Sequence, residues 1–150
     1  IGLILTDDGP KVIEYNVRLG DPETQVILPR MKTDLFELVD AAINDRPLPE
    51  VEENEDACFG VVLASKGYPT KPIHGQKLGT FPLDPNVTID YANVAGTIND
   101  LRGAGGRLLM VIGKDDSLQK ARDHVYDYLR QLDEPECFYR HDIGAKAGLQ

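Results

Sequence analysis

A carboxylate, an amide and a guanidinium recur at every second position within residues 11–19, as Glu14, Asn16 and Arg18. Alternation of polar and apolar residues predicts a strand, on which such side chains share one face about 7 Å apart. Carboxylate and amide oxygens are ligands for Mg²⁺, which takes its other ligands from water and phosphate. A neighbouring guanidinium can grip an oxyanion through two hydrogen bonds. The row suits a metal-phosphate complex, although its spacing alone is also typical of the solvent-facing side of an edge hairpin.

The residues after this row predict a turn into a helix. Gly20 lets the chain turn sharply, and Asp21 and Pro22 are residue types preferred at a helix N-cap and at the first helical position. Free N–H groups at a helix start attract anions, but the carboxylates of Asp21 and Glu23 compete for the same positive potential. In a second interpretation, these two carboxylates hold an amine-bearing substrate. The sequence leaves both interpretations open.

The complete string is more specific than its spacing. Residues 14–25, E-Y-N-V-R-L-G-D-P-E-T-Q, resemble the signature segment of the phosphoribosylamine-glycine ligase family, ATP-grasp enzymes of purine synthesis. Further likeness lies at residues 28–30, 64–69, 105–109 and 140–144. The resemblance therefore runs along nearly the whole chain. Residues 91–96 and 103–106 depart from the family pattern, so no site residue is carried over there.

The resemblance implies a reaction and a role for each polar residue. In this family ATP phosphorylates the carboxylate of glycine, and the amine of 5-phosphoribosylamine attacks the glycyl phosphate to give glycinamide ribonucleotide, ADP and phosphate. The implied roles are Mg²⁺ or Mn²⁺ ligands at Glu14 and Asn16, a catalytic and substrate-binding Arg18, and a substrate-binding turn at Asp21, Pro22 and Glu23. Catalysis would then depend on positioning and electrostatics, with ATP as cosubstrate and no side-chain nucleophile.

The elements that position these residues predict an α+β fold in two parts. A hairpin turning at residues 7–10 and a helix capped by Asp34 and ending by Asn44 fit the C-terminal remnant of an ATP-grasp domain at residues 1–46. The helix carries an apolar stripe that is expected in the core, formed by Leu35, Leu38, Val39, Ala42 and Ile43. Prolines and acidic residues predict a linker at 47–56.

Residues 57–150 are expected to form a small barrel-sandwich-like mixed domain, as in the C-terminal domain of the family. Patterning predicts strands at residues 57–65, 73–77, 79–83, 87–91, 94–98, 107–112 and 138–140. A helix from Asp116 is predicted to bury one face, comprising Leu118, Ala121, Val125, Leu129 and Leu132. Glycines within residues 103–106 predict a turn, not a phosphate loop, because the G-x-x-x-x-G-K-[ST] pattern is absent.

The charge and composition of the chain indicate which partners and which cellular environment to expect. The formal net charge of -9 disfavours a nucleic-acid partner. The sequence contains no run of 18 apolar residues and no basic-then-apolar leader, so we expect a cytoplasmic protein without membrane contact. Cys58 and Cys137 form no Cys-x-x-Cys pair and are expected to be reduced thiols.

The chain opens directly in an apolar strand without an initiating Met. We therefore expect N-terminal and nucleotide-binding parts of the same polypeptide to precede it, and the fragment alone to be inactive. Two alternatives stand beside this reading. One is a non-catalytic interaction module, and the other is a different ATP-grasp carboxylate-amine ligase.

Overall fold

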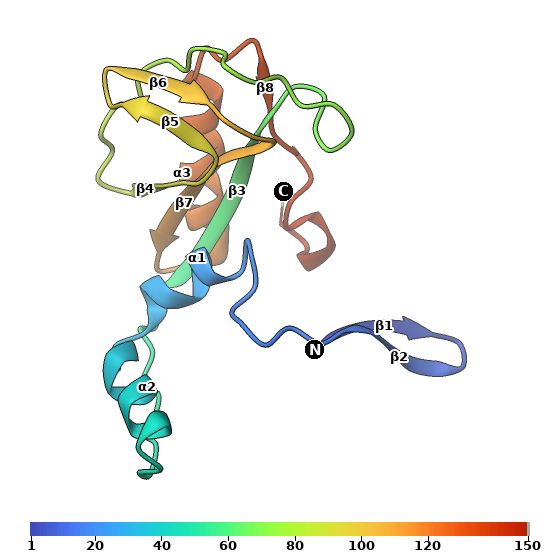
Figure 1. The fold of residues 1–150 in the computed structure, drawn as a ribbon, viewed down its shortest axis with the longest axis vertical. Helices are drawn as coiled ribbons and strands as arrows, with labels where there is room; N and C mark the ends of the chain where they lie inside the picture. The colour runs from blue at the N-terminus through green and yellow to red at the C-terminus, as the bar shows by residue number, and fades with distance from the viewer. Residues whose placement is uncertain (150) are drawn as a thin grey trace.

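The centre of the chain is a four-stranded antiparallel sheet. In the computed structural model, which describes residues 1–149, its strands lie in the order β4-β7-β3-β8 (Figure 1). Two hairpins, β1-β2 and β5-β6, form separate two-stranded sheets. The elements are β1 (Gly2–Thr6), β2 (Gly9–Glu14), α1 (Thr24–Ile27), η1 (Leu28–Arg30), α2 (Leu35–Ile43), β3 (Ala57–Ser65), β4 (Val87–Tyr91), β5 (Val94–Thr97), β6 (Asp100–Gly103), β7 (Arg107–Asp115), α3 (Leu118–Gln131), β8 (Cys137–Phe138) and η2 (Ala145–Ala147). The strand pairs are antiparallel and the helices lie between them in sequence, which confirms the predicted α+β class.

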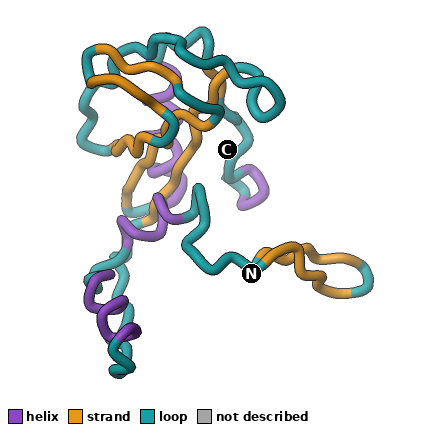
Figure 2. The backbone as a smooth tube through the Cα atoms, in the orientation of Figure 1, coloured by secondary structure: helices purple, strands orange, loops and turns teal. Residues whose placement is uncertain are grey.

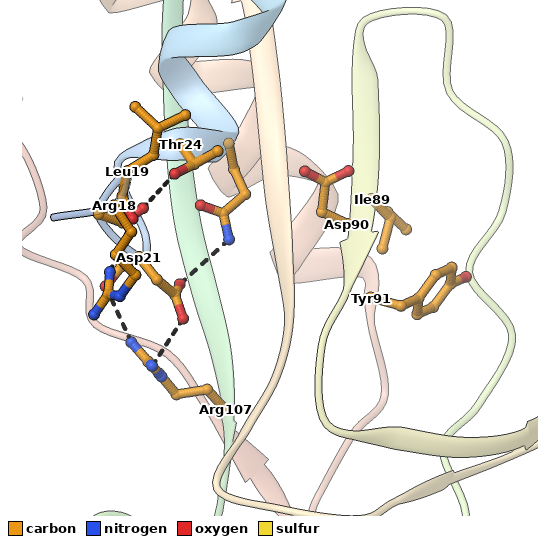
Figure 3. A pocket seen from close by; sticks show the side chains of 10 residues that line it. Arg18, Leu19, Asp21, Thr24, Ile89, Asp90, Tyr91 and Arg107 are labelled. Carbon is orange, nitrogen blue, oxygen red and sulfur yellow. Dashed lines mark hydrogen bonds and ion pairs between the residues drawn. The ribbon is translucent and has the colours of Figure 1, made fainter. Parts of the chain in front are cut away.

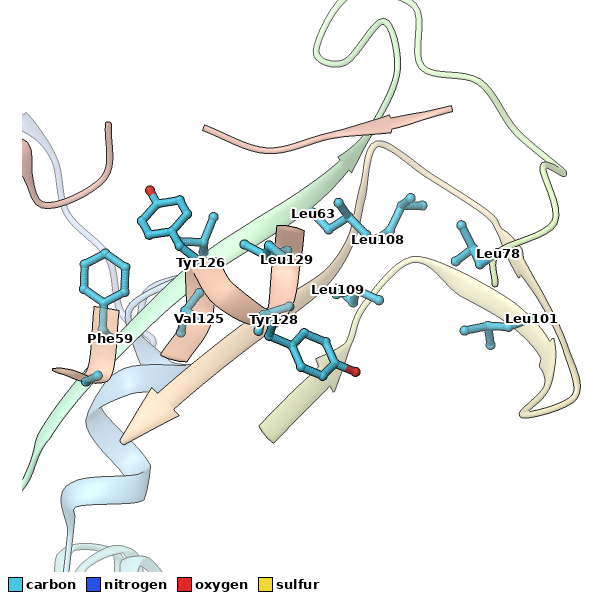
Figure 4. Close-up of a cluster of buried hydrophobic side chains, with 13 residues drawn as sticks. Phe59, Leu63, Leu78, Leu101, Leu108, Leu109, Val125, Tyr126, Tyr128 and Leu129 are labelled. Atoms are coloured by element: carbon cyan, nitrogen blue, oxygen red, sulfur yellow. The ribbon is translucent and has the colours of Figure 1, made fainter. Parts of the chain in front are cut away.

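The core lies between α3 and the two central strands, β3 and β7 (Figure 4). Ala121, Val125 and Leu129 recur at helical spacing and are fully buried against the sheet, as predicted. Burying a side chain such as Leu129 contributes about 1.5–3 kcal/mol. The helix begins after the N-cap residue Ser117, close to the predicted start, but Leu118 in its first turn is exposed.

The close approach of α3 to β7 depends on Gly113. A Cβ atom at this position would overlap the carbonyl oxygen of Ala121 and would lie 2.9 Å from Val125 Cγ2. A backbone oxygen in a helix cannot move aside as a flexible side chain can. Gly113 therefore sets the distance between helix and sheet.

A long loop, residues 66–86, replaces two predicted strands. The strands expected at 73–77 and 79–83 are wrong, because backbone pairing of this segment with β6 is limited to an isolated bridge between Lys77 and Arg102 and its flanking hydrogen bonds. Side chains also hold the segment in place. The hydroxyl of Ser65 donates to the Ile73 carbonyl at 2.7 Å and accepts from Gln76 Nε2 at 3.0 Å, and Ser65 and Gln76 are both buried. The unpredicted strand β6 pairs with β5 around a two-residue turn, with Thr97 opposite Asp100. At the other end of the chain, β8 is shorter than the predicted strand at 138–140.

The N-terminal hairpin β1-β2 extends away from the central sheet (Figure 2). It turns between Thr6 and Gly9, within the predicted turn. The strand predicted at 11–19 is correct only as far as Glu14, which pairs with Gly2, the first residue of β1. Residues 15–19 therefore lack a neighbouring strand within residues 1–149. Apolar side chains of the hairpin are exposed, including Leu5 at 83%.

Helix α2 also projects from the molecule (Figure 1). Asp34 caps it as predicted, since its carboxylate accepts from the Phe36 N–H at 2.8 Å. The expectation that its apolar stripe lies in the core is wrong for this chain, because Val39 is 48% exposed and Ile43 75% exposed. Leu38 is half-buried, and Ala41 is the one buried residue of α2. Within residues 1–149, no helix is long and apolar enough to cross a membrane.

The predicted linker, residues 47–56, returns to the residues that precede α2. Met31 and Glu53 form an isolated antiparallel bridge, Lys32 N–H donates to the Glu52 carbonyl at 2.9 Å, and Asn54 N–H donates to the Arg30 carbonyl at 2.7 Å. An ion pair of 3.0 Å between Arg30 and Glu53 reinforces this closure. Glu52 and Glu53 of the acidic run therefore help to hold the two ends of residues 33–51 close together.

Candidate active site

Glu14 and Asn16 lie together at the end of β2. Asn16 Nδ2 donates to Glu14 Oε1 at 3.1 Å, so the two side chains meet as their alternation predicted. Both residues are exposed. Neither Glu14 Oε2 nor Asn16 Oδ1 accepts a hydrogen bond from residues 1–149. Two oxygens of the type that Mg²⁺ prefers are therefore available on adjacent side chains.

A divalent cation at this pair would need further ligands from outside the chain. Among residues 1–149, no group of three or more His, Cys, Asp or Glu side chains is arranged to hold a metal ion. Magnesium commonly uses one or two protein oxygens and completes its octahedron with water and phosphate. The donor set of Glu14 and Asn16 fits that mode of binding.

Arg18 occupies a different environment from Glu14 and Asn16. The chain leaves the ladder at Glu14 and bends at residues 17–18, so the expectation of three polar groups on one strand face is wrong. Arg18 Nη1 donates to the Leu19 carbonyl at 2.8 Å. Its side chain lines a cleft that Glu14 and Asn16 do not line.

This cleft has a volume of about 880 Å³ and lies between residues 18–25 and the strands β4 and β7 (Figure 3). The signature segment forms one wall and the sheet of the C-terminal part forms the other. The lining residues are Arg18, Leu19, Gly20, Asp21, Thr24, Gln25, Ile89, Asp90, Tyr91 and Arg107. The two walls are far apart in sequence, so only the fold brings them together.

The carboxylate of Asp21 is held from both sides. Arg107 Nη2 lies 2.8 Å from Asp21 Oδ2, and Arg107 Nη1 donates to the Asp21 carbonyl at 3.3 Å. Gln25 Nε2 donates to Asp21 Oδ1 at 3.3 Å (Figure 3). Both carboxylate oxygens of Asp21 therefore already have partners within the chain.

The helix expected to start at Asp21 begins later. Helix α1 starts at Thr24, with Glu23 at the N-cap position and no capping hydrogen bond from its side chain. The Gly20 carbonyl accepts from both the backbone N–H and the hydroxyl of Thr24, so the turn is closed on itself. The predicted assignment of Asp21 to the N-cap and Pro22 to the first helical position is wrong. A helix of only four residues also provides little dipole for an anion.

Pro22 and Glu23 lie beside the cleft and do not line it. They border a smaller apolar pocket of about 240 Å³, with Val26 and Ile143 among its other lining residues. Of the substrate-binding turn implied by the resemblance, only Asp21 reaches the larger cleft. Asp21 therefore lines the large cleft, whereas Pro22 and Glu23 line the smaller pocket.

The sequence interpretation missed the residues of the second wall. Arg107 follows the glycines of residues 103–106, which were assigned to a turn, and Asp90 and Tyr91 belong to β4. The signal that could have found Arg107 is its place in residues 105–109, one of the stretches of family likeness. Nothing in the pattern of β4 distinguishes Asp90 from an ordinary strand residue.

The comparisons with known proteins place this α+β domain in one class, the C-terminal domains of ligases. Residues 58–146 match the family model described as phosphoribosylglycinamide synthetase, C domain, and the chain belongs to that family. Similar curated proteins include the phosphoribosylamine-glycine ligases of Halalkalibacterium halodurans, 42% identical over 147 residues, and Listeria innocua, 44% identical over 149 residues. Each alignment covers 97% of this chain.

A solved structure agrees with these relatives. The crystal structure of phosphoribosylamine-glycine ligase from Thermotoga maritima superposes with a TM-score of 0.78 at 33% identity over 94% of this chain. The chain spans only about a third of its relatives, namely 34% and 35% of the two curated proteins and 35% of the solved one.

Proposed function

We propose that this chain is the C-terminal part of an ATP-dependent ligase that joins glycine to 5-phosphoribosylamine. The products are glycinamide ribonucleotide, ADP and phosphate, formed through a glycyl phosphate. The observation that carries the proposal is the Glu14–Asn16 pair, with its two free oxygens, only a few residues before the Arg18 cleft. Relatives that carry the ligase name, at 42–44% identity over this segment and beyond, support it.

In the proposed reaction, the residues of this chain bind and neutralise charge. Glu14 Oε2 and Asn16 Oδ1 would hold Mg²⁺ or Mn²⁺, which when bound offsets negative charge on the ATP phosphates. Arg18, as the catalytic and substrate-binding residue, would hold the acyl phosphate or the substrate phosphate from the cleft wall. Asp21, Pro22 and Glu23 would border the substrate. No side chain of this chain needs to act as a nucleophile.

The remaining parts of the proposed site lie outside this chain. We place the adenine-binding residues in the rest of the longer polypeptide, consistent with the share of the relatives that the chain spans. The exposed apolar side chains of the β1-β2 hairpin and α2 would be covered by those parts. By this proposal the chain alone does not turn over, and the whole enzyme works in the cytoplasm.

The metal site is tested by Glu14→Ala in the full-length protein. We expect ligation of glycine and phosphoribosylamine to fall by 100-fold or more, because the loss of a metal ligand removes charge neutralisation at the phosphoryl group. Asn16→Ala should act in the same direction. Glu55→Ala is the matched control, since Glu55 is an exposed acid outside the site and should leave the rate unchanged.

The readouts are product formation and the dependence of the rate on Mg²⁺ concentration. Because Glu14 is exposed and makes no ion pair with residues 1–149, its replacement should leave thermal unfolding unchanged. Full activity in Glu14→Ala at low Mg²⁺ would overturn the metal assignment. Lack of ligation by the wild-type full-length protein would overturn the proposed reaction itself.

A further inference from the structure

Arg107 joins two segments that lie 86 residues apart in the sequence. Its guanidinium contacts both the carboxylate and the backbone carbonyl of Asp21. We propose that Arg107 is a positioning residue, which holds the Asp21 turn and the adjoining Arg18 in place for substrate binding. This inference rests on the proposed function, because it assigns the way in which the C-terminal sheet orients the site of that reaction.

The backbone of Arg107 is itself firmly placed. Its carbonyl accepts hydrogen bonds from the Asn93 backbone N–H at 3.2 Å and from Asn93 Nδ2 at 2.9 Å. Just before it, the Gly106 carbonyl accepts from the Ser65 N–H at 2.8 Å. Arg107 therefore projects from a fixed point at the start of the central strand β7.

The two glycines before Arg107 allow this placement. A Cβ atom at Gly106 would overlap the ring of Tyr68, and one at Gly105 would lie 2.7 Å from Asn93 Cβ. Neither position has room for a side chain without displacement of a neighbour. The glycines that were predicted as a simple turn thus let the chain pass closely under Tyr68 and Asn93, directly before the guanidinium that grips Asp21.

The small energy expected for the Arg107–Asp21 ion pair favours a positioning role over a role in stabilising the fold. The side chain of Arg107 is 38% exposed and that of Asp21 is 48% exposed. Ion pairs at such exposure contribute about 0–1 kcal/mol to stability, because water screens them. The same pair has a large geometric effect, since contacts to a carboxylate and a carbonyl of one residue fix both its side chain and its backbone.

The charges of the cleft also favour positioning over direct anion binding by Arg107. Its lining includes two cations, Arg18 and Arg107, and two carboxylates, Asp21 and Asp90. The formal charges of these four residues cancel, and the guanidinium of Arg107 already contacts the carboxylate and the carbonyl of Asp21. Arg18, whose described hydrogen bond goes only to the adjacent Leu19 carbonyl, is the cation left to meet a substrate anion.

The consequence of the contact is mechanical. Asp21 is three residues from Arg18, so a turn that shifts against β7 carries Arg18 with it. Misplacement of a binding group by about 1 Å can reduce a catalysed rate by 100-fold. Without Arg107, the Asp21 side chain keeps only the hydrogen bond from Gln25 within the described part of the chain.

The test uses the full-length protein with Arg107→Ala, Asp21→Ala and the double variant. We expect kcat/KM to fall 10- to 100-fold in each single variant, mainly through a higher KM for the substrates. The double variant should lose little more than either single variant, because both remove the same contact. Arg107→Lys, which retains the charge but not the two-pronged contact, should recover part of the loss.

Arg102→Ala is the matched control. Arg102 also leaves a strand of the C-terminal part and pairs with an acid, Asp100 at 3.1 Å, but it lies outside the cleft. Its replacement should leave kcat/KM unchanged. Thermal unfolding of all the variants should stay within a few degrees of wild type, and Arg107→Lys keeps the test valid if Arg107→Ala does not fold.

Wild-type kcat/KM in Arg107→Ala, or independent losses that multiply in the double variant, would overturn the positioning role. Both results are measured against an active wild-type enzyme. If the proposed reaction itself is wrong, the wild-type full-length protein shows no ligation at all, so the two failures can be distinguished.

Discussion

The imidazole of His124 on α3 donates through Nε2 to Asp115 Oδ2 at the end of β7, at 2.8 Å. This hydrogen bond, helped by the backbone N–H of Asp116, lowers the pKa of Asp115 to about 2 from its usual 3.8. The contact therefore joins the main helix to the central strand through a group that stays ionised in mild acid.

The first prediction concerns the acid stability of this contact. A carboxyl group whose pKa is lower in the folded state stabilises the fold above its unfolded pKa, and this stabilisation is lost as the pH falls. For Asp115 the loss should occur from about pH 4 towards pH 2. In urea unfolding, wild type should therefore lose stability over this interval more steeply than Asp115→Asn.

The control for the acid limb is Asp133→Asn. Asp133 is an exposed acid after α3, and its replacement should leave the loss of unfolding free energy between about pH 4 and pH 2 as steep as in wild type. An Asp115→Asn chain that loses stability as steeply as wild type below pH 4 would contradict the assignment.

A second prediction compares two glycines of the central strands. Gly113→Ala should lower the free energy of unfolding by about 1–3 kcal/mol or more, because the new methyl group meets the backbone of α3 at Ala121. Gly60→Ala should cost less than about 1 kcal/mol, since its methyl group meets mainly the flexible end of Met110. Urea denaturation of both variants checks the order, and equal costs would show that α3 is free to shift.

A third prediction concerns thiol reactivity. Burial, together with the nearby carboxylates of Glu134 and Glu136, raises the pKa of the Cys137 thiol to about 11. Since the thiolate is the reactive form, alkylation of Cys137 by iodoacetamide should be slow at pH 7 and should rise about tenfold per pH unit below the pKa. Peptide mass spectrometry measures the rate.

Glu136→Gln provides the matched variant for Cys137. Removing one negative charge favours the thiolate, so alkylation at pH 8 should become moderately faster. A rate at pH 7 equal to that of the denatured chain would contradict the raised pKa.

A fourth prediction tests whether the proposed longer polypeptide covers the β1-β2 hairpin. Leu5→Ser should change the unfolding free energy of this chain by less than about 0.5 kcal/mol, because the side chain is exposed. In the full-length protein the same change should cost about 1–3 kcal/mol, as expected for a buried leucine. Lys11→Ser, a polar residue on the same hairpin, is the control, and equal small effects of both changes in the full-length protein would exclude the contact.

The elements that the sequence predicted well are those whose pattern and partners lie within this chain. The continuous apolar run of β3 and the helical spacing of Ala121, Val125 and Leu129 reflect burial that this fold provides. The α2 stripe follows the same rule of spacing, yet residues 1–149 leave about half of Val39 and most of Ile43 uncovered. Periodicity therefore predicts that a face is apolar and does not say what covers it.

The candidate site was predictable only in part for a related reason. Spacing of two residues brought Glu14 and Asn16 together, since that relation is local and survives the end of the strand. Arg18 lies beyond the end of β2, at a bend over residues 17–18 that the alternation of residues 11–19 does not indicate. Arg107 meets Asp21 only through the tertiary fold, and no local pattern contains that information.

The closure between residues 30–32 and 52–54 means that the chain leaves and re-enters the domain at nearly one point. A segment with adjacent ends can change in length without moving the ends apart, and insertion costs grow only slowly with loop length. Residues 33–51 are thus the place where a reporter domain could be grafted, or the helix shortened, while the central sheet keeps its register.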